Sequence, residues 1–181
     1  GGMVLTRDEK LAKRTKMLGL HGMSADAWKR FTDDGYKHYD VEEIGFKYNM
    51  MDLQAALGLH QLARVEDGLV RRSQVWARYD EAFVHLPVVL PTPDAENTRH
   101  ARHLYTILLD LDRLTADRDT IQAALHRQFI GTGVHFRALH LHQYYREAYG
   151  YQRGDLPNAE WISERTLSLP LSSALTEEDV D

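Results

Sequence analysis

Three closely spaced prolines divide the 181-residue sequence into two parts with different patterns. Pro87, Pro91 and Pro93 lack a backbone N–H donor, so neither a helix nor a central strand is expected to cross this stretch. Apolar residues follow a helical spacing before it, whereas a β-rich run and another helical segment come after it. The sequence therefore predicts long helices connected to a small α/β unit, with a boundary near residue 85.

The part before the prolines contains two consecutive helices and a less regular upstream region. One helix is predicted over residues 52–64 and a second over residues 66–83, each with an apolar stripe. Another helix is predicted over residues 7–19, after a short buried strand at residues 3–6. Residues 20–44 have no period but carry many aromatic side chains, so we expect an ordered functional loop there.

After the prolines, signals for strands and helices alternate. The run HLYTILLDL at residues 103–111 is rich in β-forming residues and predicts a buried strand. Thr115 is the expected N-cap of a helix over residues 117–128, and GTGVHF at residues 131–136 predicts a glycine turn and a short strand. Thr176 is expected to cap a last helix with an acidic first turn.

The composition excludes several classes of protein. The net charge is −5 and no stretch is strongly basic, which argues against nucleic acid or anionic lipid as a partner. The absence of cysteine excludes disulfides, thiolate catalysis and zinc sites with cysteine ligands. No apolar run approaches the roughly 20 residues needed to cross a bilayer. A soluble cytoplasmic protein is expected.

Two polar clusters are candidate ligand-binding sites. Lys47, Tyr48 and Asn49 precede the first long helix, where they form either a polar entry to that helix or a binding site. His135 and Arg137 follow the glycine turn and suit an anionic or hydroxylated ligand, because both donate directed hydrogen bonds. The alternative for this pair is a solvated surface turn.

Histidine is abundant, but its spacing does not define a metal site. The closest pairs are His100 with His103 and His140 with His142, and nothing fixes a third ligand near either pair. A strand through HLH would put both rings on one face. Ordinary polar or core histidines are the favoured interpretation, and no metal site is predicted.

Five segments together resemble one family, the DegT/DnrJ/StrS family of pyridoxal-phosphate-dependent nucleotide-sugar aminotransferases. They occur in the order and spacing of that family over residues 1–181. Within the family they are most similar to the branch that makes UDP-4-amino-4-deoxy-L-arabinose for lipid A. The segments are GFKYNMMDLQAALGLHQL at 45–62, WARYDEAF at 76–83 after the arginine pair 71–72, HARHLYTILLD at 100–110, IGTGVHFRALHLHQYYRE at 130–147 and LPNAEWISERTLSLPL at 156–171.

This resemblance implies an α/β fold of the aspartate aminotransferase type, fold type I. Residues 1–85 would be the remainder of the large cofactor domain with its connecting helices, and residues 86–181 a small C-terminal α/β domain that is incomplete at its end. The implied cofactor is pyridoxal 5'-phosphate, with glutamate as amino donor and a keto nucleotide sugar, such as a UDP-4-keto-pentose, as acceptor. The implied assembly is a homodimer whose active sites are built from both subunits.

The resemblance also assigns roles to particular residues. Asn49 and Lys47 are expected to reach the phosphate of the pyridoxal phosphate held by the partner subunit, which needs donors and countercharge. The other pocket residues are expected to face the sugar nucleotide. These expected substrate-binding residues are Tyr48, His135, Phe136 and Arg137.

The family's Schiff-base lysine lies in a motif that ends in GEGG, just before the position of Gly1. The resemblance therefore implies that this chain alone lacks the catalytic lysine, and no catalytic residue is assigned within it. Two alternatives remain open. One is a relative of the same fold with another role, a sugar dehydratase or a regulatory protein. The other is a non-catalytic dimerisation fragment that uses the helices at residues 52–83.

Overall fold

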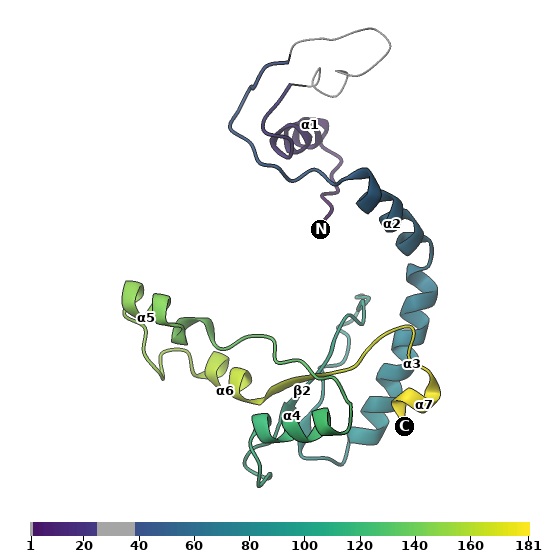
Figure 1. The fold of residues 1–181 in the computed structure, drawn as a ribbon, viewed down its shortest axis with the longest axis vertical. Coiled ribbons are helices and arrows are strands. Elements are labelled where there is room, and N and C mark those ends of the chain that lie inside the picture. Colours follow the sequence, from purple (N-terminus) through teal and green to yellow (C-terminus); the bar gives the residue numbers. More distant parts are fainter. Residues whose placement is uncertain (1, 25–38) are drawn as a thin grey trace. The chain divides into compact units, whose positions relative to one another are not determined.

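The structure is a computed structural model that describes residues 2–24 and 39–181. It contains two compact units, Gly1–Ala63 and Arg64–Asp181, whose elements are drawn in Figure 1. Among the residues described, no helix combines the length and hydrophobicity needed to cross a membrane.

The first unit contains helices α1, Glu9–Leu18, and α2, Asp52–Ala63 (Figure 1). The side chain of Asp8 caps α1 by accepting hydrogen bonds from the first free backbone N–H groups, as expected for an aspartate N-cap. Both helices confirm the sequence prediction to within about two residues. Much of the aromatic loop expected over residues 20–44 falls at 25–38, outside the described residues.

Two glycines allow two segments of this unit to lie in contact. Gly22 has a φ of 72°, a conformation that favours glycine. A Cβ at Gly22 would lie 1.7 Å from the carbonyl oxygen of Glu43, and a Cβ at Gly45 would lie 2.2 Å from the Gly22 nitrogen. Only residues without a side chain fit at both positions, so the sequence determines this close approach.

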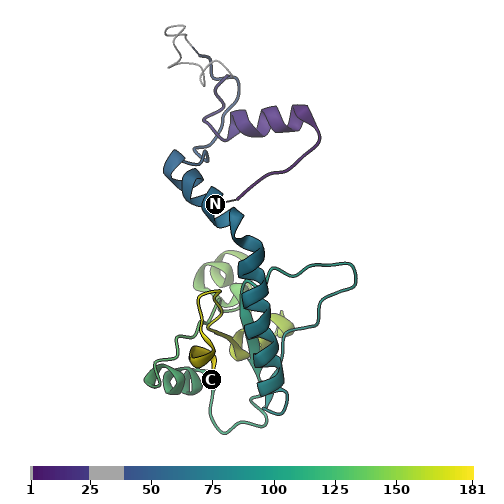
Figure 2. The same cartoon turned by 90° about the vertical axis from the view of Figure 1, so that its right-hand side faces the viewer.

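The second unit contains a three-stranded antiparallel sheet in the order β1-β2-β3. Strand β2, Tyr105–Leu109, is central and pairs with β1, Val88–Val89, and with β3, Thr166–Leu169. Helix α3, Val65–Phe83, is the longest helix of the unit (Figure 2). The remaining elements are α4 (Arg118–Arg127), the 3-10 helix η2 (Leu139–Leu141), α5 (Gln143–Tyr149), α6 (Pro157–Arg165) and α7 (Glu177–Val180).

The core of this unit lies where α3 meets β2 and β3. Tyr105 and Leu167 are fully buried, and Trp76 from α3 packs edge-on against the Tyr105 ring at 4.8 Å between centroids. The Tyr105 hydroxyl donates to Asp80 Oδ1 at 2.7 Å. Burial, with this carboxylate beside it, raises the pKa of Tyr105 well above its ordinary value. Tyr105 is therefore a neutral core residue whose one polar group is satisfied.

Most of the predicted elements of the second unit are confirmed, with shifted ends. The helix predicted over 117–128 is α4, but its N-cap is Asp117, which accepts from Thr120 N at 2.8 Å, and not Thr115. Asp117 caps the helix in place of Thr115, because an aspartate side chain accepts the same kind of hydrogen bond from a backbone N–H group. Thr176 does cap α7, in a reciprocal capping box with Asp179.

Two predicted strands were wrong. Residues 3–6 join no ladder among the described residues, and Met3, Val4 and Leu5 are exposed. The segment GTGVHF forms only an isolated antiparallel bridge, between Gly133 and Ser168. A strand needs a free edge on a neighbouring strand, and an apolar or glycine-rich pattern carries no information about that edge.

Candidate functional site

The predicted Lys47–Tyr48–Asn49 cluster begins in an extended segment that pairs with the end of α1. Phe46 N donates to Leu18 O at 2.7 Å, and Tyr48 N donates to Gly19 O at 2.8 Å. Side chains alternate in extended backbone, so Phe46 and Tyr48 share one side while Lys47 points to the other. The Phe46 and Tyr48 rings accordingly stack in parallel, with 5.0 Å between their centroids.

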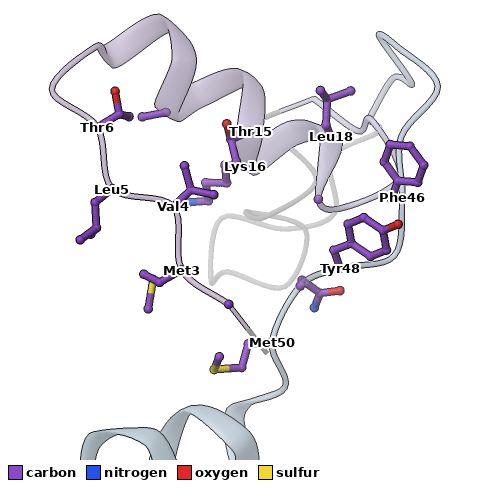
Figure 3. Close-up of a pocket in the computed structure, with 14 residues that line it drawn as sticks. Met3, Val4, Leu5, Thr6, Thr15, Lys16, Leu18, Phe46, Tyr48 and Met50 are labelled. Carbon is purple, nitrogen blue, oxygen red and sulfur yellow. The ribbon is translucent and has the colours of Figure 1, made fainter. Parts of the chain in front are cut away.

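A cavity of about 940 Å³ lies beside this segment (Figure 3). Tyr48 and Asn49 line it, together with the exposed residues Met3, Val4 and Leu5 on the far side. Lys47 is not among the lining residues. The structure therefore brings Tyr48 and Asn49 to one cavity and places Lys47 on the opposite side of the segment.

The side chain of Asn49 has a buried oxygen, Oδ1, with no hydrogen-bond partner in the described part of the chain. Leaving a buried polar group unpaired costs about 1–3 kcal/mol, so such a group is expected to meet a ligand or another chain. A half-turn of the carboxamide exchanges its oxygen and its NH₂ group. In that orientation Asn49 would present its NH₂ donors at the unpaired position, and an anionic group such as a phosphate requires such donors.

Helix α1 contributes lining residues that were not predicted from the sequence. Thr15 and Lys16 of α1 line the cavity with Ala12, and Figure 3 shows Thr15 and Lys16 on the side that faces Val4. These three residues are spaced i, i+3 and i+4, so they occupy one face of the helix. That spacing was available in the sequence, but a charged helix gave no reason to choose this face.

The second predicted cluster lies in the other unit, and each of its three side chains is exposed. His135, Phe136 and Arg137 follow the bridge between Gly133 and Ser168 and precede the buried Ala138. Arg137 lines a smaller cavity of about 240 Å³, which His135 and Phe136 do not line. The exposure of all three residues leaves their hydrogen-bonding and stacking groups accessible to a ligand.

A buried histidine–glutamate pair lies just beyond this cluster and was not predicted. His140 is only 3% exposed, and its Nε2–H donates to Glu160 Oε1 at 2.9 Å. The same oxygen accepts from Gly154 N at 2.7 Å. His142, two residues later, is exposed because the segment is a 3-10 helix and not a strand. No group of three metal-binding side chains occurs in the described residues.

Acid is expected to weaken the contribution of Glu160 to stability. The hydrogen bond from His140, and then that from Gly154 N, hold the pKa of Glu160 below its ordinary value. A lowered folded-state pKa means that the contribution is complete above the unfolded pKa of about 4.3 and is lost as the pH falls through the folded pKa. We therefore expect Glu160→Gln to reduce the loss of unfolding free energy below about pH 4.3.

Urea unfolding at a series of acidic pH values measures this slope. Glu164→Gln is the matched control, because Glu164 lies one turn later on the same helix and is more exposed. An identical acid slope in Glu160→Gln and in the unsubstituted protein would contradict the expectation.

Comparison with known proteins gives one result along the whole chain. A model of the DegT/DnrJ/EryC1/StrS aminotransferase family matches residues 1–181. An uncharacterized protein of Methanocaldococcus jannaschii is 45% identical over 180 residues, covering 99% of this chain and 47% of that protein. The spore coat polysaccharide biosynthesis protein SpsC of Bacillus subtilis is 44% identical over 182 residues, covering 100% of this chain and 47% of that protein. The chain thus spans about half the length of the curated relatives it matches.

Solved structures of sugar aminotransferases share the fold. PseC of Helicobacter pylori, an aminotransferase of pseudoaminic acid biosynthesis, has a TM-score of 0.80 at 27% identity, covering 97% of this chain and 44% of that one. Spr1654 of Streptococcus pneumoniae, a candidate sugar aminotransferase in its PLP form, has a TM-score of 0.81 at 30% identity. The match covers 97% of this chain and 42% of that one. The fold-type-I class expected from the sequence is confirmed. The chain belongs to the DegT/DnrJ/EryC1/StrS aminotransferase family.

Proposed function

We propose that this chain is part of a pyridoxal-phosphate-dependent aminotransferase that moves an amino group from glutamate to a keto nucleotide sugar. The observation that carries the proposal is the family match over residues 1–181. In this enzyme, residues 1–85 belong to the large cofactor domain and its connecting helices, and residues 86–181 belong to the small domain. The enzyme acts as a cytoplasmic homodimer.

The Lys47–Asn49 edge is proposed to contact the cofactor bound by the partner subunit. Bound pyridoxal phosphate supplies an electron sink for the substrate carbon that gains or loses the amino group. Asn49 donates from its NH₂ group to the cofactor phosphate, a role supported by its place on the cavity wall and by the unpaired buried oxygen, which a half-turn of the carboxamide exchanges for the NH₂ group. Lys47 supplies countercharge from the other side of the segment, and Tyr48 faces the shared pocket with an exposed ring.

The lysine that binds the cofactor covalently is proposed to lie outside the described residues. Such a lysine needs a desolvated environment that lowers its pKa. Every lysine in the described ranges is exposed on the surface of its unit, which does not suit that role. These exposed residues are Lys10, Lys13, Lys16 and Lys47.

Exposed apolar side chains on α2 support a second subunit as a partner. This helix has no buried residue in its unit, although four leucines lie on it. Contiguous exposed apolar surface marks an interface more often than a solvated face. In the proposed dimer, α2 is covered by the rest of the enzyme and by its twin. The four residues are Leu53, Leu57, Leu59 and Leu62.

The acceptor is proposed to be a sugar nucleotide used for a cell-surface or secreted glycan. SpsC acts in spore coat polysaccharide biosynthesis and PseC in pseudoaminic acid biosynthesis, so the relatives support this substrate class. The motifs GFKYNMMD and GTGVHFRA make a UDP-4-keto-pentose the first acceptor to test. His135 and Arg137 suit such an acceptor, because sugar hydroxyls and the diphosphate both accept hydrogen bonds.

His135→Ala is expected to slow the sugar half-reaction about 10- to 100-fold, because a hydrogen bond to a charged ligand contributes about 1.5–3 kcal/mol. The glutamate half-reaction is expected to keep its rate, since glutamate does not need this contact. Single-turnover absorbance changes of the cofactor measure the two half-reactions separately. His126→Ala, which removes an exposed histidine from α4, is the matched control. Equal losses in both half-reactions would count against substrate contact by His135.

A further inference from the structure

Residues 134–137, here called the 134–137 strap, carry the three exposed candidate ligand residues between two fixed ends. At the first end, Gly133 N donates to Ser168 O at 3.0 Å and Ser168 N donates to Gly133 O at 2.8 Å. A Cβ at Gly133 would lie 2.7 Å from Ser168 Oγ, so a larger residue there would require the serine side chain to shift. At the second end, Ala138 N donates to Ser163 Oγ at 2.8 Å.

A second attachment reinforces the end at Ala138. Glu160 Oε1 accepts from His140 Nε2–H at 2.9 Å and from Gly154 N at 2.7 Å. Glu160 and Ser163 are three residues apart on α6, so they lie on the same face of that helix. One helix face therefore holds the strap's C-terminal end through two side chains.

The inner face of α6 is unusual because its buried residue is charged. Glu160 is the buried residue of this helix, whereas the apolar Trp161 and Ile162 are 40% and 47% exposed. A helix that served only to close a core would bury its apolar residues. A buried carboxylate oxygen that accepts two hydrogen bonds instead fixes its partners in one geometry, because hydrogen bonds are directional and unpaired alternatives are costly.

Within the strap, Val134 packs against the core, whereas the side chains of residues 135–137 are exposed. The cavity of about 240 Å³ is lined by Val134 and Arg137 of the strap and by Glu160 and Ser163 of α6. Open space between the strap and the helix means that few van der Waals contacts with α6 fix residues 135–137. Their position therefore depends on the hydrogen bonds at the two ends of the strap.

We propose that Glu160 and Ser163 are positioning residues that hold the 134–137 strap in the arrangement in which His135 and Arg137 meet the sugar nucleotide. The substrate contact in this inference rests on the proposed function, whereas the anchoring of the strap does not. A strap ordered during folding does not have to be ordered again at each binding event, so anchoring favours substrate affinity. The two residues act through the strap and do not touch the substrate.

The test combines backbone exchange with kinetics in the intact enzyme. Ser163→Ala and Glu160→Ala are expected to speed amide hydrogen exchange in the peptide spanning 133–142, by about fivefold for the loss of one ordinary hydrogen bond. The same variants are expected to raise KM for the keto nucleotide sugar while leaving the glutamate half-reaction unchanged. Glu160→Gln retains an acceptor oxygen and is expected to recover most of the wild-type behaviour.

Asn158→Ala is the matched control, because it truncates an exposed side chain on the same helix that does not line the cavity. It is expected to leave both exchange and KM unchanged. Ser163→Ala removes a single hydroxyl, so it carries the test if Glu160→Ala fails to fold.

The possible failures are distinguishable. Unchanged exchange in Ser163→Ala and Glu160→Ala overturns the anchoring. Faster exchange with an unchanged KM for the sugar overturns the positioning role and leaves the proposed function standing. An unsubstituted enzyme that aminates no keto nucleotide sugar refutes the proposed function, and the exchange rates then still decide whether α6 anchors the strap.

Discussion

Leu167→Ala is expected to lower the free energy of unfolding by about 2–5 kcal/mol, the usual range when a fully buried leucine is truncated. Leu167 lies in β3, pairs with Ile107 of β2 and has no exposed surface. Its side chain belongs to the core that joins the sheet to Trp76 and Tyr79 of α3. The cavity left by the substitution is not expected to collapse easily, because the core cluster around it is closely packed and includes three aromatic rings.

Urea unfolding followed by circular dichroism measures this loss. Leu86→Ala is the control, because Leu86 is 48% exposed in the turn after α3 and its truncation is expected to cost less than about 1 kcal/mol. A loss below about 1 kcal/mol for Leu167→Ala would mean that the sheet is not the centre of this unit's core.

Asn49→Ala is expected to weaken retention of pyridoxal phosphate about 10- to 100-fold while the dimer stays intact. The substitution removes a hydrogen bond to a charged phosphate, which contributes about 1.5–3 kcal/mol. Asn49 is a single polar side chain, whereas the dimer is proposed to be held by larger apolar surface. Equilibrium dialysis measures the affinity for the cofactor, and sedimentation measures the oligomeric state.

Asn158→Ala is the control for this substitution, since Asn158 is an exposed asparagine in the other unit. Cofactor affinity unchanged by Asn49→Ala would remove the role assigned to this residue. A simultaneous loss of the dimer would assign Asn49 to the interface and not to the cofactor.

The elements that could be predicted from the sequence are those with strong local signals. The helical spacing of α2 and α3 and the β-rich run of β2 predicted these three elements because each pattern repeats over many residues. The capping box at Thr176 is likewise a local signal, complete within four residues. Local periodicity and capping therefore specify where such elements form.

The predictions that failed or were missed involve contacts between residues distant in sequence. Residues 3–6 have the composition of a strand but find no partner in the described part of the chain. Strand β3 and helix α6 were not predicted, although Pro157 in the first turn of α6 is a recognised start signal. The pairing of His140 with Glu160 spans 20 residues, and no periodic pattern indicates it.

For the candidate site too, the sequence predicted the local motifs but not how the chain arranges their side chains. Motif order located Asn49 and His135, but it did not show that Lys47 points away from the cavity that Tyr48 and Asn49 line. That difference follows from the extended backbone at Phe46–Tyr48, where neighbouring side chains alternate. Thr15 and Lys16 line the cavity because α1 folds beside this segment.

The central claim is that Asn49 serves the cofactor site of the other subunit, and hybrid dimers test it most directly. Subunits carrying Asn49→Ala are mixed with subunits that lack the cofactor-binding lysine, and amino transfer is measured at a limiting cofactor concentration. If Asn49 acts across the interface, each hybrid contains one site with both groups intact, so about a quarter of all sites in an equal mixture regain wild-type affinity. Activity no higher than that of the two parent variants would contradict the claim.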